Sequence, residues 1–89
     1  MDLNLIRNDI DTIDQELVTL LEKRMDLVTQ VAEFKRQTGK PIFDAEREQD
    51  LLQKVTDLVV DDEFKQPIRA TYEDILKQSR AFQKIKLGL

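Results

Sequence analysis

The sequence predicts an all-α fold with three helices per chain, one long N-terminal helix and two shorter ones. Two observations favour it: neither glycine nor proline occurs between residues 2 and 38, and apolar residues in that stretch recur at helical steps of three, four and seven. No segment shows the alternation of a β-strand. The 89 residues are enough for one domain, residues 1–89.

The first helix is predicted over residues 4–38. Its apolar stripe falls at positions 3, 6, 10, 13, 17, 20, 21, 27, 28, 31 and 34. The helix should end at Gly39, which suits the left-handed conformation after a helix, and Pro41 prevents its continuation. A short loop over residues 39–43 follows.

The second helix is predicted over residues 44–60 and the third over residues 64–85. Asp44 suits the N-cap position of the second helix. Pro67 fits the first turn of the third helix. The tail from Lys84 to Leu89 is expected to fray, as chain ends commonly do.

The length of the first helix predicts a dimer. A helix of 35 residues is about 52 Å long, whereas a compact chain of this size is about 30 Å across. The helix would therefore leave its apolar stripe bare unless a second copy packed along it. We expect an intertwined antiparallel homodimer with two-fold symmetry.

Composition excludes several classes of function. The chain has no cysteine and no histidine, which removes thiol nucleophiles, disulfides, imidazole bases and the commonest metal ligands, so no metal site is expected. The net charge of −4 disfavours nucleic-acid binding. No run approaches the roughly 20 apolar residues of a membrane span, and the first fourteen residues do not resemble a signal peptide. We expect a cytoplasmic protein that binds no membrane.

Two basic residues interrupt the apolar stripe. Arg24 lies four residues after Leu20, and Lys35 lies four after Val31, so both take positions at or beside the core-facing side. They point within about 20° of each other and are about 16 Å apart along the axis, which lets both reach one small anion. The alternative is that both snorkel, with their charged ends in water.

Arg7 can join this pair only in a dimer. It lies 28 residues before Lys35, a distance of about 42 Å along the same helix. In an antiparallel dimer, the partner subunit's Arg7 would come beside the C-terminal half of this helix. Taken alone, Arg7 is read as a solvated surface residue.

The later helices carry two polar pairs at i,i+4 spacing. Asp44 and Glu48 share a face with Arg47 beside them, which fits either a surface ion pair or a clamp for a hydroxyl group. Ser79 and Gln83 lie on the apolar side of the third helix. A glutamine there needs hydrogen-bond partners, which a ligand or water at the rim could supply.

An ordered set of motifs runs from residue 7 to residue 49. It consists of Ile10-Asp11-Thr12-Ile13-Asp14, Leu20-Leu21-Glu22-Lys23-Arg24-Met25, Val31-Ala32-Glu33-Phe34-Lys35, Gly39-Lys40-Pro41-Ile42-Phe43-Asp44 and Arg47-Glu48-Gln49. This set closely resembles the all-helical chorismate mutase family. The resemblance spans essentially the whole chain, although the third helix matches only through the spacing of Ser79 and Gln83.

The resemblance implies a dimer whose two active sites are each built from both chains, and the conversion of chorismate to prephenate on the way to phenylalanine and tyrosine. Arg24 and the partner subunit's Arg7 would bind the two substrate carboxylates. Lys35 would hold a carboxylate and the ether oxygen, to which Gln83 would donate a hydrogen bond. Gln78 is a nearby competitor for the role of Gln83.

The same resemblance assigns the ring hydroxyl of the substrate to Glu48 and Asp44, with Arg47 and Ser79 in support. One position departs from the expectation. Arg80, next to Ser79, places a charge where the resemblance leads us to expect the wall of the pocket.

The chemistry of this reaction agrees with the composition. One C–O bond breaks while one C–C bond forms, and that step needs no proton transfer, nucleophile, metal or redox cofactor. No cofactor is therefore expected. Two alternatives stay open: an isochorismate pyruvate-lyase on the same fold, and a non-catalytic helical dimerisation module. The chain is either a free-standing enzyme or one domain of a fused protein; Met1 and the short tail favour the former.

Overall fold

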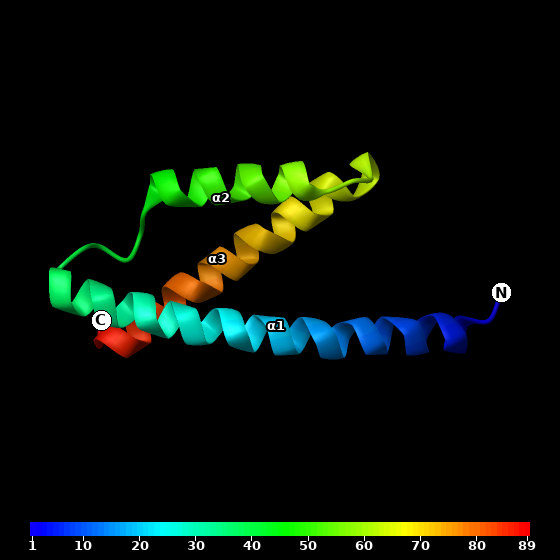
Figure 1. Ribbon diagram of the computed structural model, residues 1–89, viewed down its shortest axis with the longest axis horizontal. Coiled ribbons are helices and arrows are strands. Elements are labelled where there is room, and N and C mark those ends of the chain that lie inside the picture. The colour runs from blue at the N-terminus through cyan, green and yellow to red at the C-terminus, as the bar shows by residue number, and fades with distance from the viewer.

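The computed structural model describes residues 1–89 and is entirely helical. Its elements, in chain order, are α1 (Leu3–Thr38), α2 (Ala45–Leu58), the short 3₁₀-helix η1 (Asp62–Phe64) and α3 (Lys65–Leu87). Figure 1 shows α1 and α2 lying at opposite sides of the molecule, with α3 running obliquely from one to the other. The all-α prediction with three main helices is confirmed.

Local chemistry fixes both ends of α1. The Asp2 carboxylate accepts a hydrogen bond from the Asn4 N–H at 2.8 Å, so the helix begins at Leu3. At the other end Gly39 has φ 72°, in the left-handed region, and its N–H donates to the Lys35 carbonyl at 2.8 Å. Gly39 therefore ends the helix as its sequence context predicts.

The second helix begins one residue later and ends two residues earlier than expected. Its N-cap is Asp44, whose carboxylate accepts from the Arg47 N–H at 3.0 Å. The helix ends at Leu58 because Val59 is extended, with φ −71° and ψ 124°. The carboxylate of Asp61 then caps η1 by accepting from the Glu63 N–H at 3.0 Å. Because this cap starts η1 at Asp62, it competes with a continuation of α2 toward residue 60.

The expectation that Lys84–Leu89 frays is wrong, because α3 continues to Leu87. Gly88 is left-handed, with φ 72°, and the Leu89 N–H donates to the Lys84 carbonyl at 2.9 Å. The guanidinium of Arg36, on α1, also donates to the carbonyl oxygen of Lys86. A capping motif and a contact with another helix together order the C-terminal turn.

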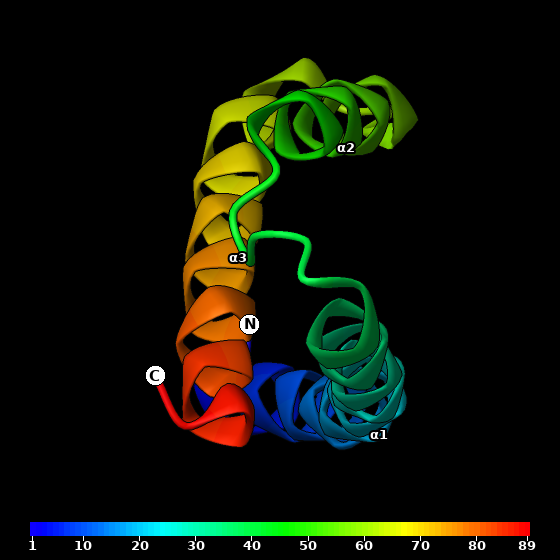
Figure 2. The ribbon, with the colours of Figure 1, turned by 90° about the vertical axis from the view of Figure 1, so that its left-hand side faces the viewer.

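The third helix holds the other two together. It packs against both α1 and α2, whereas α1 and α2 make no such contact with each other. Figure 2 shows α3 joining α2 at one end to α1 at the other. The extents are 54 × 24 × 16 Å and the radius of gyration is 16.0 Å, against about 12 Å for a compact chain of this length. The difference arises because the N-terminal half of α1 runs on beyond α3 (Figure 1).

The core is small and much of the apolar stripe is uncovered. Five apolar residues are buried: Val28, Ala32, Leu52, Val55 and Leu76. Six stripe residues on the projecting part of α1 are between 40% and 61% exposed: Leu3, Ile6, Ile10, Ile13, Leu17 and Leu20. The accessible surface is 7266 Å², whereas a compact monomer of this mass exposes about 5,400 Å². None of the helices combines the length and the apolar character needed to cross a membrane.

Candidate functional site

A cavity of about 170 Å³ lies where α1, the loop before α2, the first turns of α2 and the C-terminal half of α3 meet. Its apolar walls are Val28, Val31, Ile42, Leu51 and Leu76. Its polar lining consists of Arg24, Lys35, Asp44, Arg47, Glu48, Ser79, Arg80 and Gln83. Seven of the eight candidate residues named from the sequence therefore line one cavity. The eighth, Arg7, lies outside it, on the projecting part of α1.

Arg24 lines the cavity and is hydrogen-bonded to α3. Its Nη1 donates to the Ser79 Oγ at 2.7 Å, and that hydroxyl donates to the Ile75 carbonyl at 2.8 Å. Ser79 is buried, with 5% of its surface exposed. The snorkelling alternative places the guanidinium in water, but here it is turned inward and held by a buried hydroxyl.

Lys35, which also lines the cavity, is held by two hydrogen bonds. Its Nζ donates to the Ile42 carbonyl at 2.6 Å and to the Gln83 Oε1 at 2.9 Å. Gln83 is 6% exposed, and its Nε2 donates to the Ser79 carbonyl at 3.3 Å. Gln78 instead lines a neighbouring hollow, which shares Arg24 and Ser79 with the cavity but does not include Lys35. The register of α3 thus brings Gln83, and not Gln78, beside Lys35.

The acidic side of the cavity is formed by the start of α2. Asp44 is at once the N-cap and part of the lining. Glu48 does not pair with its neighbour Arg47. Its Oε1 accepts a hydrogen bond from the Arg80 Nη1 of α3. Sequence reasoning missed this partner, because position 80 was expected to be wall.

Burial lowers the pKa of Lys35. Desolvation lowers the pKa of its ammonium below the ordinary value of 10.5, and the negative charges of Asp44 and Glu48 partly oppose this by raising it. Because folding lowers this pKa, the unfolded chain holds the proton more tightly. The resulting penalty on folding is present at neutral pH and fades as the pH rises toward 10.5.

The neighbouring carboxylates give a direct test of this balance. Replacing Glu48 with glutamine removes one charge that raises the pKa of Lys35, so we expect that pKa to fall further. The pKa is measurable by nitrogen-15 NMR titration of the Lys35 Nζ. Glu46→Gln is the matched control, since Glu46 lies in the same first turn of α2 but outside the cavity. An equal shift in both variants would contradict the assignment.

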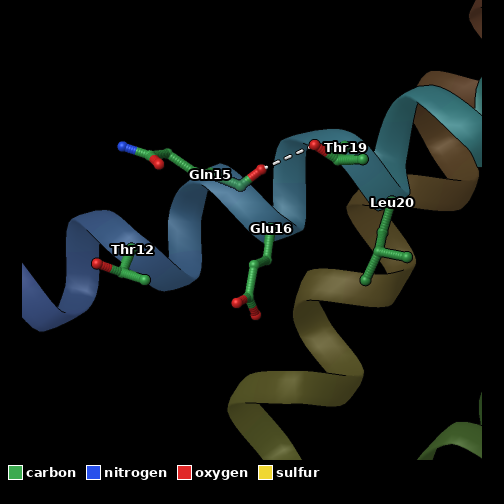
Figure 3. A pocket seen from close by; sticks show the side chains of 5 residues that line it. All are labelled: Thr12, Gln15, Glu16, Thr19 and Leu20. Carbon is green, nitrogen blue, oxygen red and sulfur yellow. Dashed lines mark hydrogen bonds between the residues drawn. The ribbon is translucent and has the colours of Figure 1, made fainter.

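A larger hollow, of about 490 Å³, lies elsewhere. Figure 3 shows its five lining residues, Thr12, Gln15, Glu16, Thr19 and Leu20, along the free part of α1. The Thr19 hydroxyl donates to the Gln15 carbonyl at 3.1 Å, which leaves it satisfied within its own helix. The lining of this hollow includes one acidic side chain, Glu16, and no basic side chain. It is an open groove on one helix, without the converging polar groups of the smaller cavity.

Residues 6–84 match the family model described as chorismate mutase type II. The chain belongs to this chorismate mutase family. A chorismate mutase of Methanocaldococcus jannaschii is 32% identical over 80 residues, which are 89% of this chain and 81% of that relative. The T-protein of Haemophilus influenzae is 48% identical over 48 residues, or 54% of this chain. A bifunctional chorismate mutase/prephenate dehydratase of Buchnera aphidicola is 47% identical over 57 residues, or 64% of this chain.

The matched segments cover 13% of the T-protein and 15% of the Buchnera protein, so this chain corresponds to a small part of each. No solved structure matches the chain. No cluster of three or more acidic side chains suited to a metal ion is present.

Proposed function

We propose that this chain catalyses the rearrangement of chorismate to prephenate, a step toward phenylalanine and tyrosine. The observation that carries the proposal is the inward-facing set of Arg24, Lys35 and Gln83 in one cavity of a chorismate mutase family member. The relative of which the match covers 81% is itself named chorismate mutase.

The reaction asks two things of the protein. It must capture a flexible dianion in the conformation in which the two carbons that bond are close together. It must also stabilise the negative charge that builds on the breaking ether oxygen, with donors that are already in place. A planar guanidinium binds a carboxylate through two hydrogen bonds, and an ammonium acts as a compact charge. Arg24 supplies the guanidinium and Lys35 supplies the ammonium.

The donors of the cavity are suited to the ether oxygen. Lys35 donates to Gln83 and to a backbone carbonyl, and on substrate binding these contacts would be exchanged for a carboxylate and the ether oxygen. The Gln83 amide has two N–H donors, of which one is used on the Ser79 carbonyl. The other remains for the ether oxygen. Arg24 would take a substrate carboxylate, kept in place by the Ser79 hydroxyl.

The acidic side of the cavity is suited to bind the ring hydroxyl of the substrate. We assign it to Glu48 and Asp44, which line the cavity at the start of α2, with Arg47 beside them. A carboxylate accepts a hydrogen bond from a hydroxyl without any change in protonation. Their charge is compatible with a dianionic substrate because four cationic side chains line the same cavity.

We assign the second substrate carboxylate to a residue of a second chain. We propose an antiparallel homodimer in which the partner subunit's α1 covers the exposed stripe and brings the partner subunit's Arg7 to the cavity. Each chain exposes about 1,900 Å² more than a compact monomer of its mass. A standard interface needs only about 800 Å² from each partner. The surface left bare by one chain is therefore ample for a stable dimer.

The direct test is to incubate purified protein with chorismate and to monitor the consumption of chorismate by its ultraviolet absorbance. The product is then identified. Prephenate formation is the expected result. Pyruvate release from isochorismate, without turnover of chorismate, would establish the lyase instead. No turnover of either substrate at high protein concentration would leave only the dimerisation module. The cytoplasmic location expected from the sequence stays a prediction.

The proposed role of Gln83 predicts a level pH–rate profile. An amide donates without titrating, so the rate should change little from about pH 5 to 8. Gln83→Glu should convert this to a profile that falls as the pH rises, because only the protonated acid can donate to the ether oxygen. Steady-state rates of both proteins across this range test the role. A steep loss near neutrality in the unmodified protein would contradict it.

A further inference from the structure

Arg80 joins two helices across the cavity and has no role in the function proposed above. Four ion pairs occur in the chain, and three of them lie within one turn of a single segment. The fourth joins Arg80 on α3 to Glu48 on α2. Its side chains are 31% and 17% exposed. A pair that is this well covered holds its geometry better than a solvated surface pair.

A second contact fixes the guanidinium from the side of the loop. The Arg80 Cζ lies 5.3 Å from the centroid of the Phe43 ring, within the range of a cation–π interaction. Phe43 directly precedes Asp44, the N-cap of α2. Arg80 therefore contacts the loop and α2 at once, and its planar group is restricted in both position and tilt.

The ion pair uses only one of the two oxygens of the Glu48 carboxylate. The hydrogen bond from Arg80 goes to Oε1, and no protein group donates to Oε2. An ionised carboxylate has two acceptor oxygens, so Oε2 remains available to a ligand. At the same time the charge of Arg80 offsets a negative charge that would otherwise face a dianionic substrate.

We propose that Arg80 is a positioning residue that fixes the Glu48 carboxylate so that its Oε2 reads the ring hydroxyl of the substrate. The inference rests on the proposed mutase function. It predicts that Arg80 acts through Glu48 and touches no part of the substrate. Its loss should weaken recognition of the hydroxyl group and leave the contacts of the two substrate carboxylates in place.

The test compares chorismate with an analogue in which hydrogen replaces the ring hydroxyl. The unmodified protein should prefer chorismate in kcat/KM, and Arg80→Met should reduce this preference by about tenfold or more, since hydrogen-bonded hydroxyl recognition contributes strongly to specificity. In a Glu48→Gln background, Arg80→Met should have little further effect. Arg80→Lys keeps the charge without the planar fork and should retain part of the preference.

Arg69→Met is the matched control. Arg69 also lies on α3, pairs with Glu73 and donates to the Thr56 hydroxyl of α2 at 3.3 Å, but it lies outside the cavity. Its loss should leave the preference unchanged. Circular dichroism of every variant checks that each one folds. Arg80→Lys supplies the kinetic test if Arg80→Met does not fold.

Three outcomes would overturn the inference. If Arg80→Met slows both substrates equally, Arg80 binds a carboxylate directly. If only thermal stability changes, Arg80 is structural. If its effect persists in full in the Glu48→Gln background, it does not act through Glu48. Failure of the unmodified protein to turn over chorismate is a separate result, because it overturns the proposed function and this inference with it.

Discussion

Lys35→Ala should lower kcat/KM for chorismate by about 100-fold or more, the usual effect of removing a preorganised donor from developing negative charge. Lys35 is the one cation of the cavity that contacts both the loop and Gln83. Two of the neighbouring cations are already engaged, Arg24 with Ser79 and Arg80 with Glu48. The loss is measured by initial rates of chorismate consumption.

Folding should survive this change. The lowered pKa of Lys35 indicates that folding disfavours its charged form, which opposes the loss of its two hydrogen bonds, so thermal stability should stay close to that of the unmodified protein. Lys54→Ala is the matched control, because Lys54 is an exposed lysine of α2 outside the cavity. A Lys35→Ala protein that unfolds, or one that keeps a rate near that of the control, would contradict the assignment.

Arg7→Ala should damage turnover as severely as Arg24→Ala does. This expectation runs against the position of Arg7 in a single chain, where it lies on the projecting part of α1 and lines no part of the cavity. It follows only if the partner subunit's Arg7 completes the site. Initial rates of the two variants, measured side by side, compare the two losses. Normal turnover by Arg7→Ala would end the shared-site proposal.

Mixed dimers make this expectation sharper. An Arg7→Ala chain paired with a Lys35→Ala chain has one site with both lesions and one site with neither. Unfolding the two proteins together and refolding them at equal amounts makes about half of the dimers mixed, so activity should return to about a quarter of the unmodified level. Refolding each variant alone is the control. Sites contained within single chains would give no recovery at all.

The features that local chemistry controls could be predicted from the sequence. Gly39 and Asp44 mark the end of α1 and the start of α2, because a left-handed glycine and a capping carboxylate act within a few residues of themselves. The shared direction of Arg24 and Lys35 follows from helix geometry alone. The i,i+4 spacings of the later helices indicated the polar candidates there, and all of the candidates but Arg7 line the cavity.

The features that depend on packing between helices could not be predicted. Arg80 meets Glu48 only through the crossing of α3 over α2, which no periodicity of either helix specifies. The order of the last turn of α3 depends partly on Arg36, fifty residues away in sequence from its acceptor, Lys86. The early end of α2 is different, because it reflects a local competition with the cap that Asp61 makes for η1.

The small core described above also bears on the amount of this protein that a cell must make. Only seven of the 89 residues are buried in one chain, too few to offset the conformational entropy lost on folding. In the proposed dimer, folding and association are then a single event, and the melting temperature rises with protein concentration. The rate of synthesis would therefore set the fraction of chains that are folded as well as their number.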